Sequence, residues 1–118
     1  SYMNKFSYGN KDSSGSLTTS WLTPKNTAES TIKISAYEQV DFMKKLWSGT
    51  LPVTKKSMEI TKKITYLETS KNGYVLSGKT GSGTIRGEID KRLGWFVAHI
   101  EGQGKEYIAV YTFNDKEY

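Results

Sequence analysis

The apolar residues between positions 36 and 47 recur at the three- and four-residue intervals of an α-helix. Ser35 precedes this run and Glu38 follows three residues later, which is the spacing of a capping box, while Gly49 supplies a stop signal. We therefore predict a helix over residues 36–48. Its buried face is expected to carry Ala36, Val40, Met43 and Trp47.

A second helix is predicted over residues 55–67. Pro52 separates it from the first helix, and Thr54 is a suitable N-cap residue. Its apolar face is expected to consist of Ile60, Ile64 and Leu67. Upstream of both helices, the pattern predicts a short helix end around residues 2–6 and a polar loop over residues 9–20.

Strand patterns occupy the second half of the chain. Asn72-Gly73 is a strong turn signal, and the apolar run 74–78 that follows it predicts a strand. Glycines come next, so we expect a turn and a weak strand through residues 84–85. The β-rich runs 94–101 and 105–113 flank a Gly-Gln-Gly segment and predict an antiparallel hairpin. Two helices followed by three strands predict an α+β fold, an antiparallel sheet with flanking helices.

Composition and charge narrow the classes of function. A chain of 118 residues that is 36% hydrophobic is one domain or part of one. The absence of cysteine excludes a disulfide framework and thiolate metal sites, and no apolar run is long enough to span a membrane. The formal charge of +5 comes from lysines that are scattered along the chain. Scattered lysines are weak evidence for nucleic-acid binding, but the positive charge favours anionic ligands.

The segment with the clearest chemistry is Lys79-Thr80-Gly81, which follows the apolar strand 74–78 and precedes Ser82. It places an ammonium group and a hydroxyl group on the edge of a strand. Enzymes that acylate a serine with a β-lactam or a D-Ala peptide use such an edge, because their substrate carries a carboxylate to anchor and a carbonyl that becomes an oxyanion. An ordinary strand-end lysine is the alternative interpretation of Lys79.

Five landmarks in order resemble the C-terminal portion of a class D (OXA-type) serine β-lactamase. They are Tyr8-Gly9-Asn10, Trp21-Leu22, Ile34-Ser35-Ala36-Tyr37-Glu38-Gln39, Lys79-Thr80-Gly81 and Gly94-Trp95-Phe96-Val97. The same pattern occurs in the penicillin-sensor domains of β-lactam-responsive regulators. The resemblance covers residues 1–118 and implies the fold shared by serine β-lactamases and penicillin-binding proteins, here as a fragment of one catalytic domain.

The resemblance also implies roles for single residues. Lys79 would supply positive potential and a proton relay, Thr80 would donate its hydroxyl to the substrate carboxylate beside Gly81, and the backbone N–H of Ser82 would be one oxyanion-hole donor. In the family the base is a carbamylated lysine in a dry pocket, so no metal or other cofactor is expected. Trp21 would donate its indole N–H to the carbamate, and Leu22 would help to exclude water.

Parts of the family site are expected outside the segment. The segment is expected to contain no Ser-x-x-Lys, the spacing of the nucleophile motif. We expect that motif and a Ser-x-Val motif to precede Ser1, and a carboxylate-binding arginine to follow Tyr118. Residues 1–118 alone should therefore be inactive. A sheet that lacks part of its cover is also expected to associate with another fragment or copy. The resemblance implies a β-lactam substrate and an extracytoplasmic or periplasmic location.

Several alternatives stay open at this stage. The complete protein is a hydrolase, a penicillin-binding sensor that stays acylated, or a transpeptidase-like binding module. Trp21 alternatively fills the core, and the supporting residues Tyr8, Gly9 and Asn10 suit a structural role equally well. For His99, the only histidine, a satisfied structural position is favoured over a general base.

Overall fold

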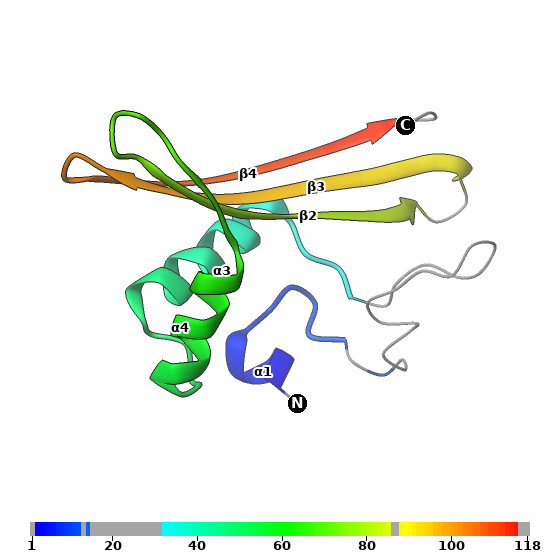
Figure 1. Cartoon of the computed structure of the whole chain (residues 1–118). Coiled ribbons are helices and arrows are strands. Elements are labelled where there is room, and N and C mark those ends of the chain that lie inside the picture. Colours follow the sequence, from blue (N-terminus) through cyan, green and yellow to red (C-terminus); the bar gives the residue numbers. More distant parts are fainter. Residues whose placement is uncertain (1, 13, 15–31, 86–87, 116–118) are drawn as a thin grey trace.

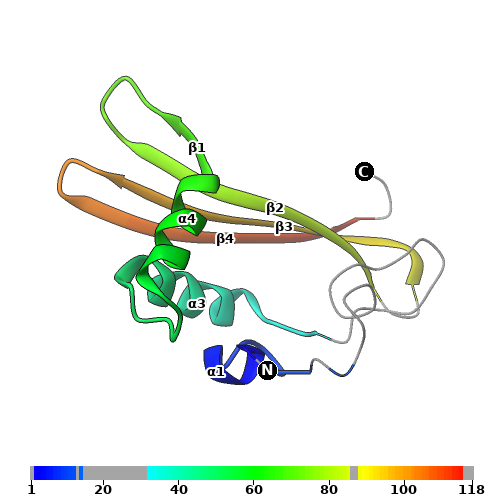
Figure 2. The ribbon, with the colours of Figure 1, turned by 60° about the horizontal axis from the view of Figure 1, so that its bottom comes forward.

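The computed structural model describes residues 2–12, 14, 32–85 and 88–115. Within these residues four antiparallel strands form one sheet, and their order in the sheet, β1-β2-β3-β4, is their order along the chain (Figures 1 and 2; β1 is labelled in Figure 2). The helices are α1 (Tyr2–Phe6), α3 (Ala36–Ser48) and α4 (Lys55–Ile64), and the strands are β1 (Tyr66–Thr69), β2 (Val75–Ile85), β3 (Glu88–Gly102) and β4 (Lys105–Asp115). No helix among the described residues is long and apolar enough to cross a membrane.

Helix α3 confirms the first prediction from the hydrophobic pattern. The hydroxyl of Ser35 accepts a hydrogen bond from the backbone N–H of Glu38, and the Glu38 carboxylate accepts one from the backbone N–H of Ser35 at 2.8 Å. Gly49 ends the helix in the left-handed conformation, with φ of 75°. Both termini are thus determined by local sequence.

Helices α3 and α4 lie under the same face of the sheet, and α3 packs mainly against β4 (Figures 1 and 2). The core beneath the sheet consists of Leu46, Leu51 and Met58, with the partly buried Phe6, Phe42, Trp47 and Val53 packed against it. These apolar contacts join α1, α3 and α4 into one layer.

The predicted end of the second helix, at residue 67, is wrong. Helix α4 ends at Ile64, and Leu67 lies in β1, so the sheet has four strands where three were expected. The predicted apolar face of α4 is wrong too, because Ile60 and Ile64 are 49% and 76% exposed while Met58 is buried. Strand β1 forms only because β2 folds back along it, a pairing that helix periodicity does not reveal.

The predicted turn after Gly81 is also absent. Strand β2 continues to Ile85 and pairs in unbroken register with β3 from Val75 opposite Glu101 to Thr84 opposite Arg92. The ladder to β3 holds the glycines extended. The predicted hairpin is confirmed, since β3 and β4 join through the two residues Gln103 and Gly104, with φ of 51° and 73°.

Candidate active site at the open edge of β2

One edge of β2 is only partly covered among the described residues. Strand β1 pairs with β2 as far as Ser77, and the backbone N–H of Gly78 donates to the carbonyl of Thr65 at 2.8 Å. From Lys79 to Ile85 the described residues place a strand on the β3 side alone. The predicted site therefore lies where the edge of β2 becomes open.

The direction of the backbone groups follows from the bond of Gly78. Since Gly78 directs its N–H away from β3, and since alternate residues of a strand direct their N–H groups to the same side, the N–H groups of Thr80 and Ser82 face the open edge. The backbone thus presents N–H donors along the open edge. The oxyanion-hole role of Ser82 stays a prediction, which requires such a donor.

The side chains of the Lys-Thr-Gly segment lie around this edge. Lys79, Thr80, Gly81 and Ser82 are all exposed. The ammonium group of Lys79 donates to the carbonyl of Thr80 at 2.6 Å, which holds the cation at the edge. Strand alternation places Lys79 on the face that carries the helices and Thr80 on the opposite face. The structure therefore brings the four residues together as one cationic, hydroxyl-bearing edge.

Gly78 is a requirement of this edge that the sequence analysis missed. A Cβ atom at this position would lie 2.7 Å from the carbonyl oxygen of Val97 and 2.9 Å from the ring of Phe96. The Phe96 ring covers this stretch of β2 from the outer face. A side chain at residue 78 would push Phe96 aside immediately before Lys79. The signal available in the sequence was a glycine inside an apolar strand.

Tyr8, Gly9 and Asn10 connect the N-terminal segment to the chain that leads into α3. The backbone N–H of Asn10 donates to the carbonyl of Lys33 at 2.8 Å, and the side-chain oxygen of Asn10 accepts from the N–H of Lys33 at 3.0 Å. Gly9 has φ of 50°, and a Cβ there would lie 1.9 Å from the Lys33 carbonyl oxygen. The structural role weighed for these three residues is thus present.

The Tyr8 hydroxyl accepts a hydrogen bond from the side-chain amide of Gln39 at 2.6 Å. The Tyr8 ring also meets the ring of Phe42 edge-on, with centroids 5.0 Å apart. Burial raises the pKa of the Tyr8 hydroxyl, and the bond to Gln39 opposes this shift in part. The phenol stays neutral and anchors the N-terminal segment to α3. Trp21 and Leu22 lie outside the described residues.

His99 occupies the satisfied structural position that the sequence favoured. Its side chain is buried, its ring stacks on that of Trp47, and Nε2 donates to the Glu106 carboxylate at 2.6 Å. Trp95 and Phe96 lie on opposite faces of β3, as strand alternation predicts. No group of three or more His, Asp or Glu side chains in the described residues is arranged to hold a metal ion.

The expectation that the segment contains no Ser-x-x-Lys is wrong as a statement about the sequence, because residues 30–33 read Ser30-Thr31-Ile32-Lys33. In this family of mechanisms the lysine must lie one helical turn after the serine. Residues 32–35 are not helical, and Ser35 is the extended N-cap of α3. The backbone of Lys33 is bonded to Asn10. Ser30 itself lies outside the described residues.

Comparisons with known proteins agree with this geometry. The sequence-family model described as the penicillin binding protein transpeptidase domain matches residues 1–118. Beta-lactamase OXA-48 of Klebsiella pneumoniae is 36% identical over 100 residues, which cover 84% of this chain and 34% of OXA-48. Regulatory protein BlaR1 of Bacillus licheniformis is 36% identical over 100 residues, which cover 85% of this chain and 15% of BlaR1. The crystal structure of OXA-427 class D β-lactamase superposes with a TM-score of 0.80 at 32% identity, covering 99% of this chain and 50% of that one.

The chain therefore belongs to the penicillin-binding transpeptidase family, and its fold is that of the class D β-lactamases. It spans 34% of the length of OXA-48 and half of the OXA-427 structure. The predicted resemblance and fold class are confirmed. The roles assigned to single residues stay predictions.

Proposed function

We propose that the protein carrying this chain is a class D β-lactamase, which opens the β-lactam amide of penicillin-type antibiotics through an acyl-serine intermediate and then hydrolyses that intermediate. The observation that carries the proposal is the open edge of β2, where Lys79 and Thr80 stand beside the edge-facing N–H of Ser82. An extracytoplasmic location follows from the class.

The chemistry of the edge suits this reaction. Attack on the β-lactam carbonyl converts its oxygen into an anion, which the N–H of Ser82 would stabilise together with the N–H of the nucleophilic serine. The carboxylate of the antibiotic would meet the Thr80 hydroxyl and the potential of the Lys79 ammonium group. A carbamylated lysine elsewhere in the domain would take the proton from the serine.

The proposal is tested with the full-length protein and a chromogenic cephalosporin. Lys79→Ala should lower kcat/KM by about 100-fold or more, because one electrostatic contact to the reacting group is lost. Lys71→Ala is the matched control, since Lys71 is an exposed lysine in the turn before β2. Full activity of Lys79→Ala, or an equal loss in both variants, would contradict the proposal.

The similarity to BlaR1 supports a second candidate, a penicillin-binding sensor. Both candidates form an acyl-serine, so the discriminating step is deacylation. After labelling with a fluorescent penicillin, loss of the label within seconds to minutes indicates the hydrolase, and an adduct that survives for hours indicates the sensor. A protein that is never labelled would leave the third candidate, a binding module of transpeptidase type.

A further inference from the structure

The side chains of four elements meet in one chain of contacts beneath the sheet, next to the candidate site. The ammonium group of Lys62 on α4 donates to the backbone carbonyl of Trp47 on α3 at 3.2 Å. The Trp47 ring stacks on the ring of His99 on β3, with centroids 4.3 Å apart and planes tilted by 21°. His99 in turn donates from Nε2 to Glu106 on β4 at 2.6 Å.

We propose that His99, held by Trp47 and Glu106, is a positioning residue for the Lys79 edge of β2. This proposal rests on the proposed function. It assigns His99 no contact with substrate and no proton transfer. Its role is to fix the point of the sheet from which the open edge of β2 extends.

The pairing of β2 with β1 and β3 explains why the position of His99 affects the Lys79 edge. His99 pairs with Ser77, which is also the last β2 residue that β1 pairs with, opposite Tyr66. Gly78 still donates its N–H to Thr65, and from Lys79 onward the described residues support β2 through β3 alone. Lys79 is two residues further along β2, so its side chain is the diagonal neighbour of His99 on the same face. A shift of the sheet at His99 is therefore transmitted directly to Lys79.

The two side chains of the hydrogen bond, His99 and Glu106, differ in burial. The His99 side chain is 3% exposed, whereas that of Glu106 is 55% exposed. The imidazole is thus locked between an indole and a carboxylate, and Glu106 can be hydrated when the bond is lost. Removing the bond should free the ring to tilt on Trp47 while leaving the core under α3 intact.

The test uses full-length protein and three variants. His99→Phe keeps a ring on Trp47 but removes the donor, Glu106→Ala removes the acceptor, and Glu106→Gln keeps an acceptor oxygen. We expect the first two to lower the second-order rate of acylation by about 10- to 100-fold at a temperature where each variant is folded, with Glu106→Gln close to the parent protein. The double variant His99→Phe/Glu106→Ala should lose no more than His99→Phe or Glu106→Ala alone, because the same bond is removed in each case.

A matched control separates positioning from general stability. Gly104→Ala strains the β3–β4 turn, where φ is 73°, and replaces none of His99, Trp47 and Glu106. It should lower Tm without changing the acylation rate of the folded protein. Equal rates in His99→Phe, Glu106→Ala and the parent protein would overturn the proposal, as would an equal loss of rate in Gly104→Ala.

Amide hydrogen exchange gives a readout that needs no activity. The Lys79 and Gly81 amides face β3, and their exchange should rise about tenfold in His99→Phe and Glu106→Ala but not in Glu106→Gln. If the parent protein is never acylated while this exchange pattern is found, the proposed function fails and the positioning role stands. If acylation is normal and the exchange rates of all variants equal the parent's, the positioning role fails and the function stands.

Discussion

Asn10 and Lys33 form a two-bond clamp across 23 residues of sequence. The backbone N–H of Asn10 donates to the carbonyl of Lys33, and the side-chain oxygen of Asn10 accepts from the backbone N–H of Lys33. The clamp joins the two ends of the segment that contains Trp21 and Leu22. The clamp therefore fixes Asn10 beside Lys33 in the fold.

The clamp predicts a specific effect of Asn10→Ala. The substitution removes the acceptor for the N–H groups of Lys33 and Asp12, so the free energy of unfolding should fall by about 1 kcal/mol. Asn10→Asp keeps the acceptor oxygen and is the control. Thermal unfolding measures the loss, and turnover by the folded full-length protein shows whether the Trp21 segment depends on the clamp. Equal Tm values for Asn10→Ala and the parent protein would show that the side-chain bonds of Asn10 to Lys33 and Asp12 add nothing.

The capping box predicts a dependence of stability on pH. The N–H of Ser35, and secondarily its hydroxyl, lower the pKa of Glu38 below its ordinary value of 4.5. A lowered pKa in the folded state stabilises the fold above pH 4.5, and this contribution is lost as the pH falls through the folded-state pKa. Glu38→Gln keeps an acceptor without a charge. The Tm difference between parent and variant should therefore be largest near neutral pH and shrink below about pH 4.

The control for this experiment is Glu59→Gln on α4, which changes the net charge equally without touching a cap. A Tm difference for Glu38→Gln that is constant between about pH 7 and pH 3 would contradict the argument.

How much the sequence predicts depends on where the determining contacts lie. Helix α3 is predicted correctly because Ser35, Glu38 and Gly49 determine its ends locally. The β3–β4 hairpin is predicted correctly because Gln103 and Gly104 form a two-residue turn. Strand β1 and the second half of β2 are missed, because their conformation comes from partners far along the chain rather than from their own residues.

The candidate site likewise combines features that local sequence determines with features that depend on distant residues. The Lys-Thr-Gly segment is recognisable from consecutive letters, and the edge of β2 then presents it as expected. The stacking of His99 on Trp47 and the packing of Phe96 over Gly78 join residues that are distant in sequence. No local pattern identifies such pairs without the register of the sheet.

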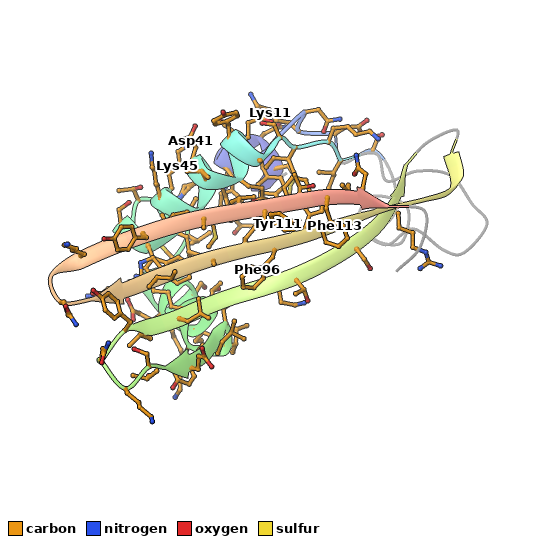
Figure 3. The ribbon with its side chains drawn as sticks, turned by 90° about the horizontal axis from the view of Figure 1, so that it is seen from above. Lys11, Asp41, Lys45, Phe96, Tyr111 and Phe113 are labelled. Atoms are coloured by element: carbon orange, nitrogen blue, oxygen red, sulfur yellow. The ribbon has the colours of Figure 1, made fainter. Side chains whose placement is uncertain are left out.

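The outer face of the sheet predicts that the isolated chain associates. Figure 3 shows Phe96, Tyr111 and Phe113 together on the face opposite the helices, and Tyr107 and Tyr111 are 50% and 62% exposed. Exposed aromatic surface of this kind drives association in water. Sedimentation of the 118-residue chain should therefore show mass that increases with concentration.

Replacing Tyr107 and Tyr111 together with lysine should shift that equilibrium toward the monomer. Tyr37→Lys is the control, because Tyr37 is 87% exposed but stands on α3, away from this face. A parent chain that sediments as a monomer at every concentration would contradict the prediction.

The Ser30–Lys33 spacing leads to the last prediction. In the full-length protein Ser30→Ala should be acylated by a fluorescent penicillin at the parent rate. The reason is that Ile32 and Lys33 lie in a non-helical segment, and the backbone of Lys33 is bonded to Asn10. The 118-residue chain alone should neither be labelled nor turn over a chromogenic cephalosporin, because we expect the nucleophilic serine to lie outside it. Mass spectrometry locates any label. An adduct on Ser30 that disappears in Ser30→Ala would show that this serine is the nucleophile. The expectation that the nucleophile lies outside residues 1–118 would then be wrong.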